Sequence, residues 1–321
     1  REREKERDRQ MVFRIAHISD LHVSGWSNQH TPFHPSFLTS KRILGWINMR
    51  FRRGQDKYQT RALEASLRDM RDNLVDAVVV SGDLTNLALP EEFQRVSCLL
   101  SQDEELRQRM LIVPGNHDIY TGGCPGRALF QQHMAQPCGP TFLRPHPQVG
   151  ILGLNSALPR PPFMSSGALT PLDPHVRAFQ EHLADPALKI RVAVLHHPPL
   201  PRSGALHNLH PQHRQLVASL CDRWQVDLLL NGHTHRPFQG RLHNRCGTPS
   251  YDTGSSTQFS PQQPTCSARY SWYDFCPQEG RMVAACHRVF QWDDSNSFRS
   301  EEIPVLRPLE HGQGATVTSW S

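Results

Sequence analysis

The stretch Val12-Phe-Arg-Ile-Ala-His-Ile-Ser-Asp-Leu-His22 joins a mostly apolar run to a carboxylate and an imidazole. Short apolar runs bounded by turn residues are typical of strands that are buried on both faces of a sheet. Asp20 and His22 are two residues apart, so on extended backbone their side chains point to the same side. We therefore expect this stretch to give two ligands to one metal ion.

Four later segments repeat this plan. Each is a short apolar run that ends in candidate ligands: residues 77–83 end in Gly-Asp83, 110–118 in Gly-Asn-His-Asp118, 191–197 in His-His197 and 226–235 in Gly-His-Thr-His235. Open α/β sheets place their functional side chains at the carboxyl ends of the strands. The sequence thus predicts an α/β fold in which five strand ends meet at one site.

The chemistry of these residues indicates which ions the site would bind. Neutral imidazole and carboxylate together suit Mn, Fe, Co and Zn better than Ca or Mg alone. Each motif by itself could be a turn or a strand-end cap. Those readings would need five coincidences in chain order, so we interpret the set as a site for transition metals.

In this order, D-x-H, G-D, G-N-H-D, H and G-H-x-H make the chain similar to the calcineurin-like metallophosphoesterases from about Val12 to about Gly254. The resemblance implies a four-layer αββα sandwich, that is, two mixed β-sheets flanked by helices, and two divalent ions bridged by a hydroxide that attacks phosphorus. It implies the following roles: Asp20, His22 and His235 bind one ion, Asn116, His196 and His233 bind the other, Asp83 bridges the two, His117 is catalytic, and Asp118 orients His117.

One ligand is left open by the sequence, because either His196 or His197 could bind the ion. The family usually writes this element as His-x-Pro, which selects His196. His197 would then point to the opposite face, where it lines the substrate cleft or packs.

The resemblance implies a dinuclear metal-dependent hydrolase of phosphodiester or pyrophosphate bonds, and a small phosphodiester, nucleotide or nucleotide-lipid substrate. The compact motif set resembles the cyclic-nucleotide phosphodiesterase branch. The alternative is the UDP-2,3-diacylglucosamine pyrophosphatase of lipid A synthesis. A third candidate is a non-catalytic protein-binding scaffold of the same fold, as in a retromer subunit, but such relatives typically lose ligands that are all present here.

The least expected segment is residues 41–53, a basic amphipathic insert before the first long helix. It carries Lys41, Arg42, Arg50, Arg52 and Arg53, a charge equal to the formal net charge of +5 of the whole chain. The remainder is near neutral, so no specific nucleic-acid partner is expected. The insert is either an interfacial helix that contacts a membrane surface or a helix that docks on the core with a charged rim.

We expect three regions: a charged disordered arm at 1–10, a metallophosphoesterase domain at 11–297 and a loose tail at 298–321. Helices are predicted over 60–74, from Pro90, from Asp173 and over 212–224, and a β meander over 241–292. None of the eight cysteines forms a C-x-x-C pair and no run of 18 apolar residues exists. Free thiols and a cytoplasmic location, peripheral to the membrane if the insert is interfacial, are the expectation.

Overall fold

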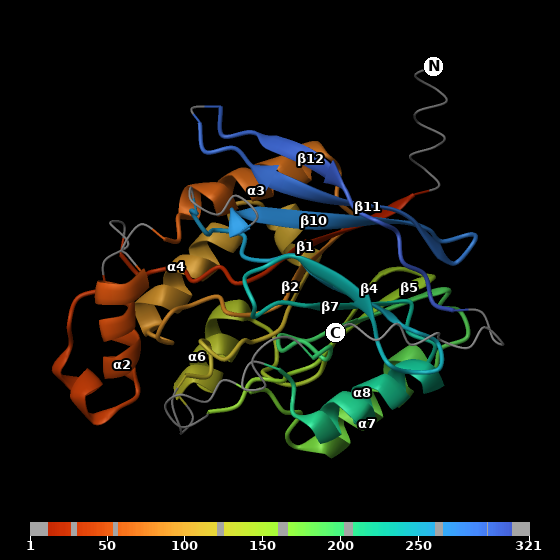
Figure 1. Cartoon of the computed structure of the whole chain (residues 1–321), viewed down its shortest axis with the longest axis horizontal. Coiled ribbons are helices and arrows are strands. Elements are labelled where there is room, and N and C mark those ends of the chain that lie inside the picture. Colours follow the sequence, from red (N-terminus) through yellow and green to blue (C-terminus); the bar gives the residue numbers. More distant parts are fainter. Residues whose placement is uncertain are drawn as a thin grey trace, which may run out of the picture.

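Two six-stranded sheets lie face to face at the centre of the molecule (Figure 1). The computed structural model describes residues 12–26, 31–53, 57–120, 125–159, 166–201, 208–260, 266–293 and 295–309, without the side chains of residues 39, 52 and 53. The predicted arm at 1–10 lies outside these residues.

The first sheet has the order β12 (Phe298–Glu302), β11 (Arg281–Phe290), β10 (Arg269–Cys276), β1 (Phe13–Ile18), β2 (Ala77–Val80) and β3 (Met110–Ile112). The second has the order β4 (Thr141–His146), β5 (Val149–Gly153), β6 (Ile190–Val194), β7 (Leu228–Asn231), β9 (Pro249–Asp252) and β8 (Phe238–Arg241). In the first sheet β2 pairs in parallel with β1 on one side and with β3 on the other. In the second sheet the neighbouring strands β5, β6, β7 and β9 are parallel to one another. All five apolar runs that precede the candidate ligands form strands of these parallel sets.

Helices cover the outer faces of both sheets. The elements outside the first sheet are η1 (Pro35–Thr39), α2 (Arg42–Ile47), η2 (Asn48–Arg53), α3 (Thr60–Asp72), α4 (Pro90–Leu100), α5 (Glu104–Gln108) and α6 (Pro125–Met134), and those outside the second are α7 (Leu172–Ala178), η3 (Phe179–Leu183) and α8 (Pro211–Arg223). A separate apolar core, including Ile15 and Val79 from one sheet and Ile151 and Val192 from the other, fills the space between the sheets. The layers are therefore helix, sheet, sheet, helix, which confirms the predicted αββα sandwich.

The helices form where the apolar spacing predicts them. In α3, Leu63, Leu67 and Met70 recur at helical intervals and are all buried. Pro90 opens α4 at a position that needs no backbone N–H donor, and the exposed Glu91 of the first turn lies near the positive end of the helix dipole. Among the helices of the described ranges, none has the length and hydrophobicity that crossing a bilayer requires.

Two expectations for the C-terminal third need correction. Residues 298–302 are not part of a loose tail, because they form the edge strand β12 on β11, and Ile303, Val305 and Leu306 then pack on the core between the sheets. The predicted meander over 241–292 is also split: β8 and β9 pair in the second sheet, whereas β10 and β11 belong to the first. Alternating apolar patterns predict strands but not the sheet that each strand joins.

Candidate metal centre

The carboxyl ends of five strands bring the predicted site residues together. Asp20 and His22 follow β1, Asp83 follows β2, Asn116 and His117 follow β3, His196 follows β6, and His233 and His235 follow β7. They form two groups of ligand atoms that share Asp83: Asp20, His22, Asp83 and His235 in one, and Asp83, His196 and His233 in the other, with all atoms of a group within 4.8 Å of one another.

Left-handed backbone, and not extended backbone, aims these side chains. Five of the residues have positive φ: Asp20 at 52°, His22 at 44°, Asp83 at 52°, His233 at 78° and His235 at 57°. Non-glycine residues rarely adopt this conformation, and where they do it marks functional sites held by their surroundings. The expectation that Asp20 and His22 continue an extended strand was wrong, because both residues have positive φ, although their backbone N–H groups still bond to Gly82 and Asp83.

Glycines in the motifs allow the backbone of one strand end to approach another. A Cβ atom on Gly115 would collide with the backbone and carboxylate of Asp83, and one on Gly232 would collide with the Ser19 hydroxyl beside Asp20. Any larger residue at these two positions would force apart the ligand-bearing turns. The glycines of G-N-H-D and G-H-x-H are therefore part of the site geometry.

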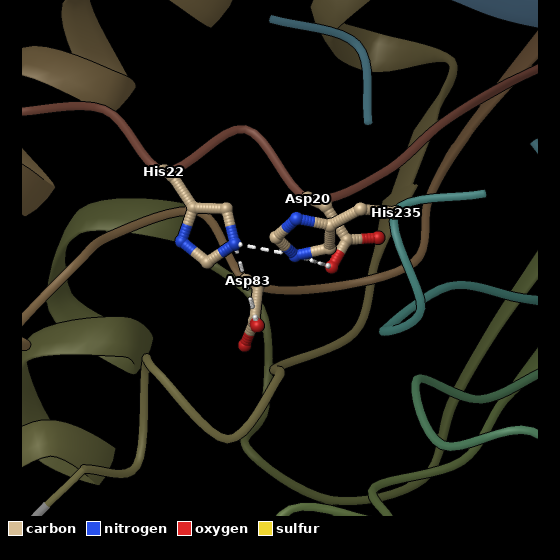
Figure 2. A group of neighbouring side chains, drawn as sticks. All are labelled: Asp20, His22, Asp83 and His235. Atoms are coloured by element: carbon tan, nitrogen blue, oxygen red, sulfur yellow. Dashed lines mark hydrogen bonds and ion pairs between the residues drawn. The ribbon is translucent and has the colours of Figure 1, made fainter. Parts of the chain in front are cut away.

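In the first group, Nε2 of His22 lies 3.0 Å from Nε2 of His235 and 3.7 Å from a carboxylate oxygen of Asp83. His235 Nε2 is also 3.3 Å from Oδ1 of Asp20 (Figure 2). Two imidazole nitrogens and two carboxylates thus converge on one small volume. Mixed nitrogen and oxygen donors at this spacing fit a divalent transition metal.

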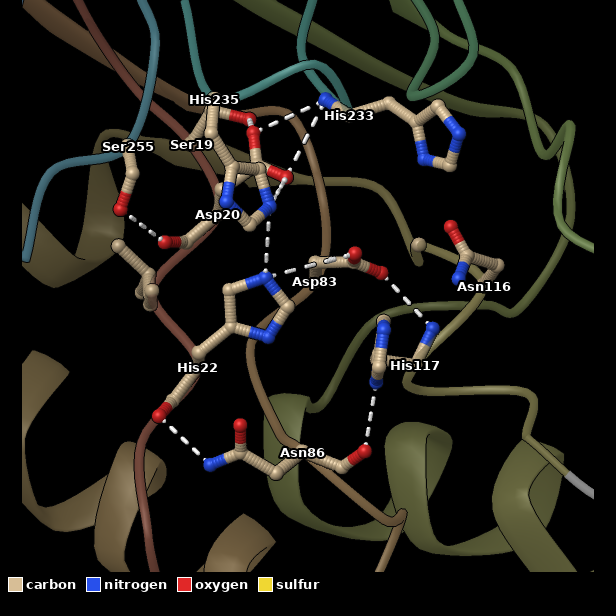
Figure 3. A network of polar contacts seen from close by, with 12 residues as sticks. Ser19, Asp20, His22, Asp83, Asn86, Asn116, His117, His233, His235 and Ser255 are labelled. Atoms are coloured by element: carbon tan, nitrogen blue, oxygen red, sulfur yellow. Dashed lines mark hydrogen bonds and ion pairs between the residues drawn. The ribbon is translucent and has the colours of Figure 1, made fainter. Parts of the chain in front are cut away.

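In the second group, Nε2 of His196 lies 3.4 Å from Oδ1 of Asp83, 3.2 Å from Oδ1 of Asn116 and 3.2 Å from Nδ1 of His233. Figure 3 shows Asn116 and His233 on one side of Asp83, and His22 and His235 on the other. Asp83 therefore lies between two donor sets, as a bridging carboxylate must.

Polar partners lie on the far side of two imidazole rings, so that the other ring nitrogen faces the site. Nδ1 of His196 donates to the carbonyl oxygen of Ser81 at 2.7 Å, which leaves Nε2 facing Asp83 and Asn116. Nδ1 of His235 is 3.1 Å from the hydroxyl of Tyr58. Such outer partners are what metal-binding histidines usually have, because they set the tautomer and the ring orientation.

His197 has a different environment. Its Nδ1 is 2.9 Å from the hydroxyl of Ser156, and its buried ring lies against Gly167, where a Cβ would collide with the imidazole. Its ring centroid is 4.7 Å from that of His233. The geometry thus favours His196 over His197 as the ligand, with His197 packed behind His233.

The electrostatics favour positive charge at Asp83. Burial alone would raise the pKa of this carboxyl group, but the neighbouring histidines His196, His117 and His22 hold it well below its usual range. For His196 burial has the opposite effect and by itself would lower the pKa. The charge of Asp83 and its hydrogen bond to the ring outweigh burial, and the pKa of His196 rises to about 9. A divalent cation would experience the same negative field.

His117 lies beside the two groups, and its surroundings correct one expectation. Its backbone N–H donates to Oδ1 of Asp83 at 2.8 Å, and its Nδ1 donates to the carbonyl oxygen of Asn86 at 2.6 Å. Asp118 was expected to orient this ring. Its carboxylate instead accepts bonds from the backbone N–H groups of Leu84, Thr85 and Gly115 and from the Thr85 hydroxyl, at 2.9 to 3.2 Å.

Asp118 therefore joins the turn after β2 to the turn after β3, the two turns that carry Asp83 and Asn116. Burial and the nearby Asp83 charge raise the pKa of the Asp118 carboxyl to about 7. The cost of burying this group is offset by its four hydrogen bonds, as expected for a structural carboxylate.

Several supporting residues were not predicted. Ser81, Ser19 and Asp20 form a buried chain in which the Ser81 hydroxyl donates to Ser19 Oγ at 2.8 Å and Ser19 Oγ donates to Asp20 Oδ2 at 2.7 Å. The Ser255 hydroxyl donates to the carbonyl oxygen of Asp20 at 2.7 Å (Figure 3). Serines lie in many loops of the sequence, and only the fold shows which of them reach the site.

Known proteins resemble this chain in sequence. Residues 13–237 match the profile of the family described as calcineurin-like phosphoesterase. A curated relative, the glycerophosphodiester phosphodiesterase GpdQ of Enterobacter lignolyticus (strain SCF1), is 29% identical over 230 residues, which are 69% of this chain and 70% of the relative.

Solved structures share the fold at low sequence identity. Purple acid phosphatase PPD1 from yellow lupin has a TM-score of 0.54 at 13% identity, covering 90% of this chain and 53% of the lupin chain. A dimetal phosphatase from Danio rerio has a TM-score of 0.52 at 12% identity, covering 86% of this chain and 95% of that chain. GAP50, the anchor in the inner membrane complex of Plasmodium, has a TM-score of 0.52 at 10% identity, covering 92% of this chain and 90% of the GAP50 chain.

The profile match spans more than half of the chain and agrees with the order of the motifs, the sandwich of two sheets and the two donor groups around Asp83. The chain belongs to the calcineurin-like phosphoesterase family, hydrolases that act on phosphoester bonds.

Proposed function

We propose that the protein is a phosphodiesterase with a dinuclear metal centre. The observation that carries this proposal is the pair of donor groups sharing Asp83. Asp20, His22 and His235 would hold one ion, Asn116, His196 and His233 the other, and Asp83 both. Two bound divalent ions, among Mn, Fe, Zn and Co, supply Lewis acidity and an activated water for attack on phosphorus.

The chain's own residues would complete the chemistry. Asn86 fixes the ring of His117 through Nδ1, so Nε2 is the nitrogen that exchanges a proton with substrate. We assign His117 to protonation of the leaving oxygen, a role worth about 10²- to 10⁴-fold in rate. Asp118 holds the turns and acts through the positions of Asp83 and Asn116.

For the substrate we propose a small phosphodiester of the glycerophosphodiester kind, because the curated relative acts on that class. Cyclic nucleotides and the pyrophosphate of UDP-2,3-diacylglucosamine are the two alternatives. The scaffold reading is disfavoured by the complete donor set, because a binding scaffold needs no pair of converging ligand groups. The fold alone does not decide this point, since GAP50 shares it.

A substrate panel tests the proposal. Metal-loaded protein is assayed with bis(p-nitrophenyl) phosphate, glycerophosphoethanolamine, cyclic AMP and UDP-2,3-diacylglucosamine. We expect turnover of bis(p-nitrophenyl) phosphate well above metal in buffer, and the highest kcat/KM among the biological compounds for glycerophosphoethanolamine. Absence of turnover with all four compounds would reject the proposed phosphodiesterase activity. A preference for UDP-2,3-diacylglucosamine, the pyrophosphate, would reject glycerophosphodiesters as the substrate class.

We also propose that the basic insert lies against an anionic membrane surface and that the protein is peripheral to the cytoplasmic face of that membrane. Leu44 and Ile47 of α2 and Phe51 of η2 are 39%, 41% and 72% exposed, beside Phe33 and Leu38 at 45% and 66%. Exposed arginine Arg50 lies in the same segment. Apolar and basic side chains on one short helical segment are what an interfacial element carries.

A further inference from the structure

The N-terminal end of α2 reaches the catalytic histidine through one aromatic ring. Nζ of Lys41, the N-cap residue of α2, lies 4.7 Å from the centroid of the Tyr120 ring. That ring in turn stacks on the imidazole of His117, with centroids 5.3 Å apart and planes 29° apart. The insert therefore places a cation on the His117 side of the metal centre.

The position of Lys41 is fixed by its neighbours in α2. Arg42 donates through Nε to the carbonyl oxygen of Leu87 and through Nη2 to that of Ala88, both at 2.9 Å. Gly45 is buried, and a Cβ there would collide with the Tyr120 hydroxyl and the Leu87 side chain. α2 is thus docked on the turn that follows Asn86, the residue that orients His117, beside α4 and α6 (Figure 1).

Electrostatics connect Lys41 to the shared carboxylate. Burial lowers the pKa of the Lys41 ammonium, and the negative charge of Asp83 opposes this shift without cancelling it. Two divalent ions would carry more positive charge than Asp20 and Asp83 neutralise. In the metal-loaded protein the centre would keep a net positive charge, so an anion bound there would also interact favourably with the half-buried Lys41 ammonium.

We propose that Lys41 is an anion-binding residue of the active site and contacts a phosphoryl oxygen of the substrate, or of the phosphate product, held at the metal centre. This inference rests on the proposed metal centre and deepens it. The insert then has two faces with different tasks: the docked face completes the wall of the active site, and the opposite face carries the exposed apolar side chains. A phosphoryl group with two negative charges should depend on Lys41 more than one with a single charge.

The test measures binding of inorganic phosphate to metal-loaded protein by titration calorimetry, which needs no turnover. Lys41→Met removes the charge and keeps much of the stem over Tyr120, and Lys41→Arg restores the charge. Arg50→Met is the matched control, since it removes one positive charge from an exposed position of the same insert. Because a charge-assisted hydrogen bond is lost, phosphate should bind Lys41→Met about 10- to 100-fold more weakly, and Arg50→Met within about 2-fold of wild type.

Metal content and thermal melting of each variant separate anion binding from misfolding, and Lys41→Gln replaces Lys41→Met if the latter does not fold. In assays we expect KM for p-nitrophenyl phosphate, a dianion, to rise more than KM for bis(p-nitrophenyl) phosphate, a monoanion. Equal phosphate affinity in Lys41→Met and Arg50→Met, with two metals retained, would overturn the inference, as would a wild-type protein that binds no phosphate. Phosphate binding that depends on Lys41 in a protein that hydrolyses no diester would instead reject the proposed function alone.

Discussion

The ring of His117 is oriented by the backbone carbonyl group of Asn86. A substitution of the Asn86 side chain would leave this carbonyl group in place. Nδ1 of the ring is bound to that carbonyl, and the backbone N–H of His117 bonds to Asp83, so the residue is held at both ends beside the proposed metal ligands. This arrangement lets the ring be deleted without taking away a proposed ligand. The role of His117 can therefore be separated experimentally from metal binding.

We predict that His117→Ala retains two metal equivalents while kcat falls about 10²- to 10⁴-fold. The loss should be smaller for esters of p-nitrophenol than for alkyl esters, because a good leaving group needs little protonation. Elemental analysis and steady-state kinetics on both kinds of ester check this. Equal losses for good and poor leaving groups would exclude the acid role.

Glu92 offers a second prediction at the scale of one residue. It is fully buried in α4, its Oε2 accepts from the N–H groups of Leu87 and Leu89, and burial raises its pKa to about 8 from the usual 4.5. Below pH 4.5 the group is protonated in the folded and unfolded chain alike. As the pH rises towards 8, only the unfolded chain releases the proton, so the free energy of unfolding decreases.

Glu92→Gln keeps an acceptor for both N–H groups and cannot ionise. Between pH 5 and pH 8, in chelator, its free energy of unfolding should therefore decrease less than that of wild type, by on the order of 2 to 4 kcal/mol. The exposed neighbour Glu91, changed to Gln, serves as the control and should follow the wild-type pH dependence. Urea denaturation at the two pH values measures the difference, and parallel curves for all three proteins would contradict the assignment.

The residues that the structure brings together could be predicted from the sequence, but the contacts that aim their side chains could not. The motifs predicted Asp20, His22 and Asp83 because the type and the order of residues can be read from a single sequence. Their positive φ angles, and the partners Asn86 and Ser255, depend on turns and on segments distant in sequence. The assumption of extended backbone at Asp20 failed for this reason.

At the scale of elements, the insert has features of both readings of its pattern, the core-docked helix and the interfacial helix that we propose. Arg42 and Gly45 dock α2 as a core-bound helix would, whereas Leu44, Ile47 and Phe51 are exposed as an interfacial helix requires. Amphipathic composition predicted a helix with two faces. It could not show that Lys41 is on the docked side, because this depends on contact with Tyr120, nearly eighty residues later.

If the exposed side contacts lipid, replacing Arg50, Arg52 and Arg53 by Gln should weaken binding to anionic vesicles, since each basic residue near such a surface contributes about 1 kcal/mol. Wild-type binding should also weaken as salt is added. Three exposed arginines elsewhere, Arg71, Arg109 and Arg281, replaced together by Gln, provide the control. Vesicle sedimentation at low salt is the measurement, and wild-type protein that stays in the supernatant would end the membrane proposal.

At the scale of the whole molecule, the order of the strands explains the site. β1, β2 and β3 are parallel neighbours in one sheet, β6 and β7 in the other, and all five present their carboxyl ends to the same region. Five apolar runs predicted these strands, and the family resemblance predicted the sandwich. The edge strand β12 was missed because Phe298-Arg-Ser-Glu-Glu302 is too polar to read as a strand without the partner that it pairs with.

The central claim is that two metal ions share Asp83, and the stoichiometry of metal activation tests it most directly. Chelator-stripped protein is titrated with Mn²⁺ while turnover of bis(p-nitrophenyl) phosphate and bound metal are measured together, for wild type, Asp83→Ala and His22→Ala. We predict that wild-type activity rises until two equivalents are bound, that His22→Ala keeps one ion firmly, and that Asp83→Ala loses both ions and nearly all activity. Two ions retained by Asp83→Ala, or wild-type activity complete at a single equivalent, would contradict the account.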